Sequence, residues 1–327
     1  MKIFISGSSG FIGSHLTEHF ARKGYNVVAF DRYNINNDYG WLEKTKFKKK
    51  INFILGDIRD YDSVYKSMKG CDIAIHLAAL IGIPYSYVSP TAYLKTNVEG
   101  TFNILESAKE LNLKQVIITS TSEVYGTAKN YNLNEEDVVS AQSPYAASKI
   151  AADQLGLSYF KSYSLPVKII RPFNTYGPRQ SLRAIIPTIS TQLLKNKKKI
   201  IKIGNIKATR DFTYVHDLCE AYESVLKCKK LVGQIVNVGT NTEFSILEIT
   251  DKISKILNIR KFKYKIEKKR VRPNKSEVFR LRCNNRKLKK LTNWKPKYSI
   301  NKGLRELIEW LLDEENIKNY KINKYNI

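Results

Sequence analysis

The sequence predicts an α/β fold, in which a doubly wound parallel sheet is joined to a smaller C-terminal α/β domain. Short apolar segments that suit buried strands recur at residues 2–6, 25–30, 51–55, 72–77, 115–120 and 167–171. Helical patterns separate them, for example at residues 92–111 and 146–162. Strands that alternate with helices in this way favour a parallel sheet covered by helices on both faces.

The first strand runs directly into a turn with glycines at Gly7, Gly10 and Gly13. Gly7 permits a tight turn, Gly10 lets a pyrophosphate approach the backbone, and Gly13 lets the following helix pack on the strand. The N–H groups at the start of that helix, around Phe11 and Ile12, would hold the phosphates. The G-x-x-G-x-x-G spacing is also compatible with an ordinary turn.

The second strand ends in Asp31, about 20 residues past the glycines, where a carboxylate can accept both ribose hydroxyls of a dinucleotide. Asp31 would repel a 2′-phosphate, so the sequence favours NAD over NADP. Arg32 is the complication, because an arginine there could accommodate that phosphate. The alternative for Asp31 is an ordinary turn residue.

Candidate cofactor contacts also follow the third and fourth strands, because ligands collect at the carboxyl ends of parallel strands. Asp57 and Ile58 follow the third strand and could meet the adenine. Leu77, Ala78 and Ala79 end the fourth, where small residues would let a cofactor lie against the backbone. Either segment could equally be an ordinary loop.

Tyr145 and Lys149 lie one turn apart on a helix that begins at Ser143-Pro144, with serine as the cap. A phenol titrates near about 10, and a cation about 4 Å away contributes roughly 4 kcal/mol at moderate dielectric. The Lys149 ammonium, helped by a nicotinamide charge, would therefore bring Tyr145 near neutrality. With Thr121 at a strand end, the pair suggests reversible oxidation of an alcohol.

Several of these motifs together resemble the extended short-chain dehydrogenase/reductases, Rossmann-type proteins that modify nucleotide sugars. The resemblance runs from residue 1 to about residue 310 and also includes Asn97, which implies a further cofactor contact. Within that family, residues 121–126 (TSEVYG) and 83–90 (IPYSYVSP) are most similar to nucleotide-sugar 4,6-dehydratases of bacterial legionaminic-acid-type pathways. We therefore expect NAD-dependent 4,6-dehydration of a GDP- or UDP-linked N-acetylglucosamine.

Glu123 is the residue that distinguishes this reaction. Once carbon 4 of a hexose is oxidised, the proton on carbon 5 becomes acidic and a carboxylate can remove it. Similar dehydratases carry an aspartic acid before this glutamate to protonate the leaving hydroxyl, whereas this chain has Ser122. A serine hydroxyl is a poor general acid, so we expect Glu123 to take the proton and also to pass it on.

The substrate-binding half begins after Arg171, where the strand–helix alternation loosens. We expect a cofactor domain at residues 1–172 with returning segments near 211–240, a substrate domain at 173–315 and a loose tail at 316–327. Arginine forks suit diphosphates. The resemblance implies substrate contacts by Thr121, Asn174, Arg210 and Arg272, and Arg179 is a further candidate for the diphosphate. The resemblance also implies a homodimer or homotetramer, formed through the helices at 92–111 and 146–162.

The composition indicates which ligands and surfaces the protein can bind. The formal net charge is +26, but the lysines are scattered along the chain, so we expect capture of an anionic nucleotide sugar rather than nucleic-acid binding. No segment approaches the roughly 20 apolar residues of a membrane span, and we expect a cytoplasmic protein with no membrane partner. The cysteines form no C-x-x-C pair and offer no metal site; they are Cys71, Cys219, Cys228 and Cys283.

Three other functions stay open at this stage. A nucleotide-glucuronate decarboxylase also resembles the 121–126 motif, and its oxidised substrate would lose carbon dioxide instead of water. A nucleotide-sugar 4-epimerase would need no carboxylate at position 123. A non-catalytic dinucleotide- or nucleic-acid-binding protein would keep only the fold, although Thr121, Tyr145 and Lys149 argue against it.

Overall fold

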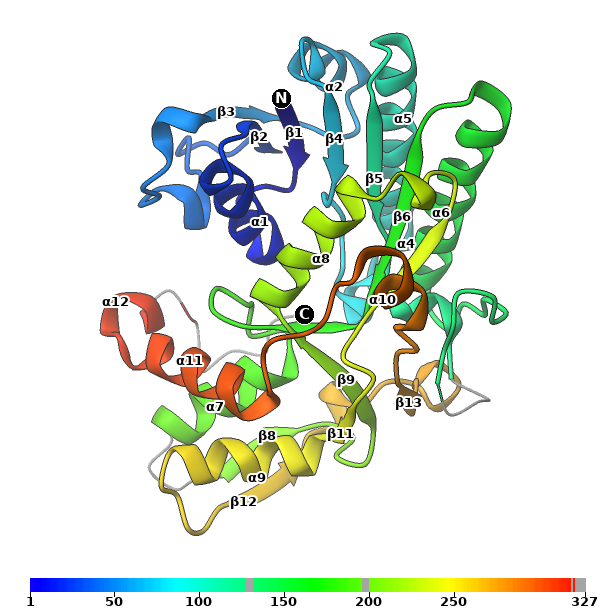
Figure 1. Ribbon diagram of the computed structural model, residues 1–327. Helices are drawn as coiled ribbons and strands as arrows, with labels where there is room; N and C mark the ends of the chain where they lie inside the picture. The colour runs from blue at the N-terminus through cyan, green and yellow to red at the C-terminus, as the bar shows by residue number, and fades with distance from the viewer. Residues whose placement is uncertain (128–131, 196–199, 319, 321–327) are drawn as a thin grey trace.

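The computed structural model describes residues 1–127, 132–195, 200–318 and 320, and it contains a seven-stranded sheet beside a smaller domain (Figure 1). The sheet order is β10-β6-β5-β4-β1-β2-β3, and all neighbouring strands run parallel. The doubly wound parallel sheet predicted from the sequence is therefore confirmed. Its strands are β1 (Lys2–Ser6), β2 (Asn26–Arg32), β3 (Ile51–Gly56), β4 (Ile73–His76), β5 (Gln115–Thr119), β6 (Val167–Pro172) and β10 (Ile235–Val238).

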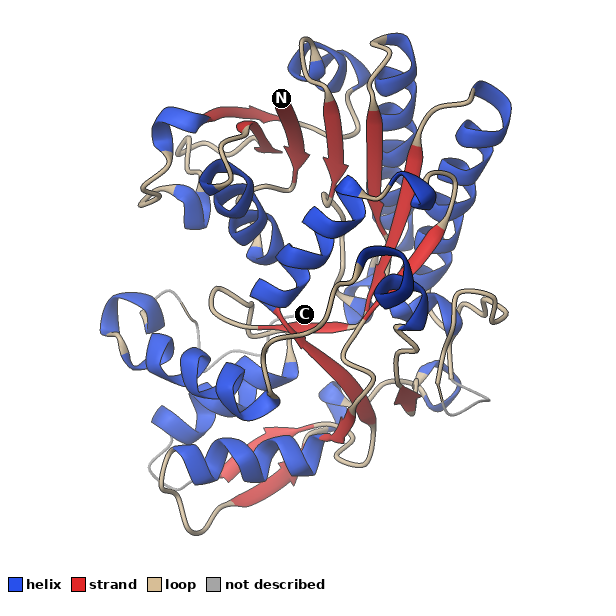
Figure 2. Cartoon of the chain, viewed as in Figure 1, coloured by secondary structure: helices blue, strands red, loops and turns tan. Residues whose placement is uncertain are grey.

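Helices cover both faces of this sheet (Figure 2). Side chains alternate between the two faces of a strand, and here both faces carry apolar side chains that the helices bury. Ile3 and Ile5 of β1 belong to a core with one set of helices, whereas Phe4 belongs to the core on the opposite face. The first set is α1 (Phe11–Arg22), α8 (Val215–Lys227) and α10 (Arg286–Thr292). The second set is α2 (Tyr61–Met68), α5 (Gly100–Glu110) and α6 (Pro144–Tyr163).

The helix predicted at residues 92–111 is not one continuous α-helix in the structure. It comprises α4 (Pro90–Tyr93), a π-helical segment η3 (Leu94–Glu99) and then α5. The π-helical segment carries Asn97, whose side chain is turned into the protein with an exposure of 1%. Single-turn π segments inside helices are frequent at functional sites. Shorter helices near the carboxyl ends of the strands are α3 (Ile83–Val88) and η4 (Ser122–Tyr125).

The smaller domain has its own core of aliphatic side chains between helices and short strands, among them Ile189, Ile249 and Leu307. Strand β9 pairs with β7, β11 and β13, and β8 pairs with β12. The strands are β7 (Asn174–Tyr176), β8 (Ile200–Ile203), β9 (Thr209–Tyr214), β11 (Glu243–Ser245), β12 (Lys263–Ile266) and β13 (Arg280–Leu281). The helices are α7 (Ile185–Lys195), α9 (Ile246–Ile256), α11 (Ile300–Leu312) and α12 (Glu314–Ile317).

The chain crosses between the domains more often than the sequence suggested. Strand β10 and helix α8 return to the large sheet, and α10, expected in the substrate domain, packs against β10 and α8. Residues 316 and 317, expected in a loose tail, belong to α12, and Tyr320 packs against Trp41 and Trp310. The rest of that predicted tail, residues 319 and 321–327, lies outside the described residues.

In the part of the chain that the structure describes, none of the helices is both long and apolar enough to cross a bilayer.

We predict that Gly13→Ala destabilises the fold strongly. A Cβ atom at Gly13 would lie 2.0 Å from the Gly7 carbonyl oxygen, whereas one at Gly10 would lie 3.4 Å from it. Overpacking costs about 1–3 kcal/mol or more, and an alanine at the Gly10 N-cap costs about 1 kcal/mol. Denaturant unfolding should therefore show a larger loss for Gly13→Ala than for Gly10→Ala. Equal losses would contradict this close packing.

Candidate active site

The glycine turn is fixed by close backbone packing against the end of β4. Gly7 has a φ of +71°, and a Cβ there would lie 2.8 Å from the Ala78 nitrogen. The Ser6 hydroxyl accepts hydrogen bonds from the backbone N–H groups of Leu77 and Ala78, both at 3.2 Å. The turn, the start of α1 and residues 77–79 therefore lie together at the carboxyl end of the sheet, where a dinucleotide fits.

Asp31 lies at the end of β2 but is largely occupied by protein donors. Its Oδ2 accepts from the Ser9 N–H at 2.7 Å and the Ser9 hydroxyl at 2.5 Å, and its Oδ1 accepts from the Arg32 N–H at 2.7 Å. A carboxylate offers about four acceptor positions. The predicted acceptance of both ribose hydroxyls therefore requires the Ser9 hydroxyl to turn away.

Three further predicted cofactor contacts already have partners within the protein. The Ile58 side chain is buried in the core, where Gly100 packs against it, so a contact with adenine would involve its backbone. Both N–H groups of the Asn97 amide are taken, by the Leu80 carbonyl at 3.0 Å and the Ser148 hydroxyl at 2.9 Å. Asn97 therefore fixes the backbone at Leu80 and ties it to helix α6. Asp57 is paired with Arg59.

The carboxyl end of β5 carries the predicted catalytic segment. Thr121 caps the short helix η4, and its hydroxyl accepts from the Glu123 N–H at 3.2 Å. Thr121 also lies close enough to the Tyr145 phenol to lower its pKa. Ser122 is buried. Thr121, Glu123 and Tyr145 are therefore brought together, as the sequence predicted.

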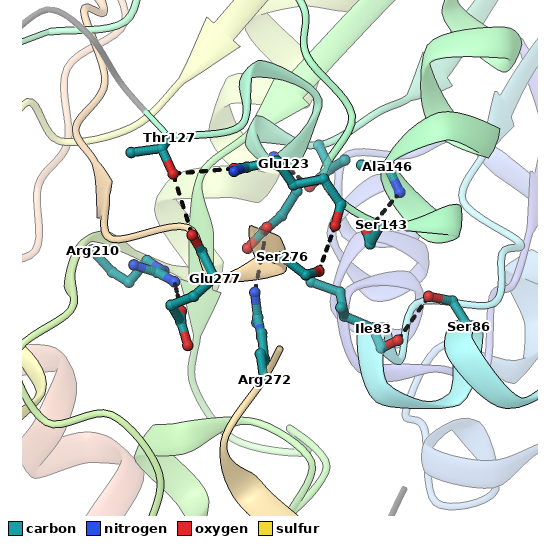
Figure 3. A network of polar contacts seen from close by, with 12 residues as sticks. Ile83, Ser86, Glu123, Thr127, Ser143, Ala146, Arg210, Arg272, Ser276 and Glu277 are labelled. Atoms are coloured by element: carbon teal, nitrogen blue, oxygen red, sulfur yellow. Dashed lines mark hydrogen bonds and ion pairs between the residues drawn. The ribbon is translucent and has the colours of Figure 1, made fainter. Parts of the chain in front are cut away.

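Helix α6 presents Tyr145 and Lys149 to this segment because Ser143 caps its first turn, accepting from the Ala146 N–H at 3.1 Å (Figure 3). The Lys149 ammonium donates to the Thr119 carbonyl at 2.5 Å. Both side chains are buried, with exposures of 7% for Tyr145 and 4% for Lys149. The phenol and the ammonium therefore lie at the end of β5, away from bulk water.

Without the nicotinamide charge that the prediction included, the pKa of Tyr145 is raised rather than lowered. Burial raises the pKa of the Tyr145 phenol, the hydrogen bond with Thr121 lowers it, and the Glu123 charge raises it again. Burial also lowers the pKa of Lys149 to about 8, against the attraction of Asp153. The Lys149 ammonium instead bonds to the Thr119 carbonyl, and burial is the largest influence on the pKa of the phenol.

A buried ion pair that the sequence analysis missed lies behind Lys149. Asp153, one turn further along α6, accepts from Arg171 Nε at 3.0 Å, and Arg171 Nη2 lies 2.9 Å from the same oxygen. Asp153 is fully buried and Arg171 has a side-chain exposure of 2%. The spacing in the sequence could have revealed Asp153, because positions 145, 149 and 153 share one helix face.

Two arginines predicted to bind the substrate lie beside Glu123 (Figure 3). Arg272 Nη1 is 3.6 Å from Glu123 Oε2, and Arg210 Nη2 is 3.6 Å from Glu277 Oε1. Burial lowers the pKa of Arg210, and the nearby Glu123 and Glu277 carboxylates raise it. The cluster therefore combines two carboxylates with two guanidinium groups. Glu277 was not predicted, because its place in the site depends on the fold of the second domain.

Asn174 and Arg179 are placed differently from each other. The Asn174 Oδ1 atom is buried and, within the described residues, has no hydrogen-bond partner, which suits a ligand donor. Arg179 pairs with Glu18 of α1 at 3.0 Å and has a φ of +70°. The structure therefore directs Arg179 to the cofactor domain rather than to Arg210 and Arg272.

The geometry permits a specific sequence of proton movements. A hydroxyl beside Tyr145 could lose its proton to this side chain once it is a phenolate, and the Glu123 carboxylate lies near the same phenol. General bases work from within hydrogen-bond reach of their proton. Arg210 and Arg272 offer forked donors that suit a diphosphate.

Comparison with known proteins places the chain in a family. The family model described as GDP-mannose 4,6 dehydratase matches residues 4–307, so the chain belongs to that family of extended short-chain dehydrogenase/reductases. The family-level resemblance predicted from the sequence is therefore confirmed. The legionaminic-type subfamily stays a prediction.

Curated relatives carry out more than one reaction. A dTDP-D-glucose 4,6-dehydratase of Dictyostelium discoideum is 37% identical over 275 residues, which are 78% of this chain and 62% of that protein, less than two thirds of its length. A UDP-N-acetyl-alpha-D-glucosaminuronate decarboxylase of Bacillus cytotoxicus is 31% identical over 328 residues, covering 96% of this chain and 99% of that one. Sequence similarity therefore defines a family of nucleotide-sugar enzymes, not one reaction.

Solved structures give the same result. The dTDP-glucose 4,6-dehydratase DesIV of Streptomyces venezuelae, crystallised with NAD, has a TM-score of 0.87 and 26% identity, covering 99% of this chain and 100% of that chain. A UDP-glucuronic acid 4-epimerase of Bacillus cereus, crystallised with UDP-glucuronic acid and NAD, also has a TM-score of 0.87, with 28% identity over 95% of this chain and 99% of that chain. Both contain the cofactor that the sequence favours.

We predict that Lys149→Met changes how stability depends on pH. The unfolded lysine keeps its proton up to about 10.5, whereas the folded one releases it near about 8. The unfolded state therefore binds more protons between these values, and wild-type stability gains from this group as pH rises. The unfolding free energy of Lys149→Met relative to wild type should fall across that window, measured by denaturant unfolding.

Lys168→Met is the matched control, because Lys168 is also buried and its pKa is also lowered to about 8. It should show the same pH trend but keep substrate-dependent cofactor reduction, which Lys149→Met should lose. A stability difference for Lys149→Met that does not change with pH would contradict the lowered pKa.

Proposed function

We propose that the chain is an NAD-dependent nucleotide-sugar 4,6-dehydratase that acts on GDP- or UDP-linked N-acetylglucosamine. The observation that carries the proposal is the Glu123 carboxylate, which follows Thr121 on η4 and lies near the Tyr145 phenol. An enzyme that only oxidised and reduced carbon 4 would need no carboxylate there. The N-acetyl sugar rests on the similarity of residues 83–90 and 121–126 to one subfamily.

The cofactor site fits a dinucleotide, because the absence of a Cβ at Gly7 and Gly13 lets the glycine turn pack against residues 77–78 and α1, which leaves the start of α1 at the carboxyl end of the sheet. The residues proposed to hold NAD line the ends of β1, β2, β3 and β4 and include Tyr145 and Lys149. NAD held there would supply a reversible hydride acceptor, and its positive charge, together with that of Lys149, would favour the Tyr145 phenolate.

The chain's own groups move the protons. Tyr145 takes the proton of the 4-hydroxyl while Thr121 hydrogen-bonds to the same oxygen. Glu123 then removes the proton from carbon 5, which the new ketone has made acidic. Glu123 passes this proton to the 6-hydroxyl, which leaves as water. Carbon 5 then takes up a proton from solvent, and Tyr145 releases to solvent the proton that it took from the 4-hydroxyl. The product is the 4-keto-6-deoxy sugar.

The substrate's diphosphate is proposed to bind Arg210 and Arg272, with Asn174 bound to the sugar or its phosphate. The two guanidinium groups lie on the same side of the site as Glu123. Arginine pairs are suited to the planar, bidentate recognition of phosphates. Arg179, paired with Glu18, would reach the substrate only if that ion pair opened.

A nucleotide-glucuronate decarboxylase is the second candidate, favoured by Arg272. A substrate carboxylate on carbon 5 would lie near Glu123, where like charges repel. Arg272, 3.6 Å from Glu123, is a cation that could offset this repulsion. Mass spectrometry after incubation with each substrate class separates the two, because one reaction releases water and the other carbon dioxide.

The predicted homodimer or homotetramer also stays a proposal. It would form through α5 and α6, where Phe102 and Tyr163 are large side chains with exposures of 42% and 57%. Exposed aromatic side chains suit the centre of an interface.

We predict that Glu123→Gln permits partial cofactor reduction but abolishes water loss. The amide cannot take the carbon 5 proton, although Thr121, Tyr145 and Lys149 can still oxidise carbon 4. General acid–base catalysis contributes about 10²–10⁴-fold, so dehydration should fall at least that much. Absorbance of the reduced cofactor and mass spectrometry of the sugar measure the two steps separately.

The matched control is Ser122→Ala at the neighbouring position. If Glu123 performs both proton transfers, Ser122→Ala should retain dehydration to within about tenfold, because its hydroxyl is not the general acid. A loss as large as that of Glu123→Gln would show that Ser122 takes part, and full turnover by Glu123→Gln would rule the mechanism out.

A further inference from the structure

Side chains from the large domain hold residues 272–277, here called the strap, next to Glu123. The Gln142 side-chain amide donates to the Lys275 carbonyl at 3.2 Å. The Thr127 hydroxyl lies 3.2 Å from the Glu277 carbonyl oxygen and can donate to it. Between these two contacts, the Ser276 hydroxyl donates to the Gln142 carbonyl. Three successive strap residues are therefore held by groups outside the strap.

The strap has little regular structure of its own. Strand β12 ends at Ile266 and β13 begins at Arg280. Between them, in the described chain, lie two single-turn helices, η6 (Lys268–Arg270) and η7 (Asn274–Ser276). Residues 272–277 pair with no strand. Their position therefore depends mainly on side-chain hydrogen bonds.

Tyr87 completes this set of contacts. Its hydroxyl lies 2.5 Å from the Ser276 hydroxyl. Since Ser276 donates its own proton to the Gln142 carbonyl, Tyr87 is the donor and Ser276 the acceptor. Consecutive hydrogen bonds of this kind polarise and strengthen one another. The chain of bonds thus runs from Tyr87 through Ser276 to the backbone of Gln142.

Tyr87 belongs to α3, inside the 83–90 segment that the mechanism leaves unexplained. One turn earlier on α3, Ile83 packs with Tyr93 and Tyr145 in a small apolar cluster. Residues at i and i+4 share one face of a helix. Helix α3 therefore touches the catalytic tyrosine with one turn and the strap with the next.

The strap carries charges that face the reaction site. Arg272 lies at its start and pairs with Glu123, and Glu277 lies at its end and pairs with Arg210 (Figure 3). Glu277 and Arg210 have side-chain exposures of only 10% and 8%. A shift of the strap would therefore move a counter-ion of Glu123 and a counter-ion of Arg210 together.

We propose that Tyr87, Gln142 and Ser276 are positioning residues that hold the strap so that Arg272 and Arg210 are aligned to receive the substrate's diphosphate. The inference rests on the proposed function, since it concerns the same nucleotide-sugar site. It assigns a task to the 83–90 segment: Tyr87 supplies the hydroxyl, and α3 links the strap to the side of Tyr145. The cofactor turn, at the ends of other strands, is not part of this set of contacts.

The test compares Tyr87→Phe and Ser276→Ala with Tyr85→Phe. Tyr85 is the matched control because it lies on the same helix, also has an exposure of 37%, and its ring faces Tyr93. The first measurement is hydrogen–deuterium exchange of peptides that cover residues 272–277 in the free protein. Exchange should be faster in Tyr87→Phe and Ser276→Ala and unchanged in Tyr85→Phe. Unchanged exchange in all three would overturn the proposal.

The second measurement is calorimetric binding of GDP, UDP and NADH. Tyr87→Phe, which loses one hydrogen bond, should weaken binding of the preferred nucleoside diphosphate by about three- to tenfold, and Ser276→Ala, which loses two, by at least as much. NADH binding should stay within about twofold of wild type. The double variant should be no weaker than Ser276→Ala, because that variant already removes the contact that Tyr87→Phe removes. Ser276→Thr, which keeps the hydroxyl, should restore binding.

The outcomes separate this inference from the proposed function. If wild type binds neither GDP nor UDP, the proposed function fails, and the exchange measurement still decides whether Tyr87 holds the strap. If wild type binds a nucleotide and Tyr87→Phe binds it equally well, the positioning role is overturned while the proposed function stands. Effects of the two single variants that multiply in the double variant would also overturn it.

Discussion

The burial of the Lys149 ammonium at the end of β5 is the constraint on which the catalytic half of the molecule depends. A buried cation is costly unless it is paired and hydrogen-bonded. Here the Thr119 carbonyl accepts from the ammonium, and Asp153 supplies a negative charge that raises the pKa of Lys149. Asp153 is in turn paired with Arg171, whose guanidinium lies 4.9 Å from the centre of the Tyr125 ring. Each charge in this series requires the next, because breaking a buried pair leaves an uncompensated ion.

The charges near Glu123 are also paired, but these pairs are longer than the Asp153–Arg171 pair. Glu123 with Arg272 and Arg210 with Glu277 are loose pairs at 3.6 Å, and they face the reaction site rather than the core. Loose pairs can exchange partners when a diphosphate arrives. In the proposed complex, the phosphates would take over the arginines and Glu123 would be left to act on the sugar. In this proposal, the buried Asp153–Arg171 pair supports Lys149, whereas the Glu123–Arg272 and Arg210–Glu277 pairs open to receive the substrate.

The sequence predicted the large sheet well because its strands are buried on both faces and read as apolar runs. Thr121, Glu123, Tyr145 and Lys149 came together as expected because each stands at the carboxyl end of β5 or on the adjoining helix face. The contacts made by Glu277, Ser276 and Tyr87 could not be predicted. They depend on how the second domain folds back on the first, and long-range placement leaves no periodic pattern. The pairing of Arg179 with Glu18 was missed for the same reason.

One labelling measurement tests the central claim most directly. The wild-type enzyme is incubated with NAD and GDP- or UDP-linked N-acetylglucosamine that carries deuterium on carbon 4, and the product is analysed by NMR. If the site oxidises carbon 4, eliminates water and returns the same hydrogen, the deuterium appears on carbon 6 of a 4-keto-6-deoxy sugar. Deuterium that remains on carbon 4, in starting material or in an epimer, would contradict the account.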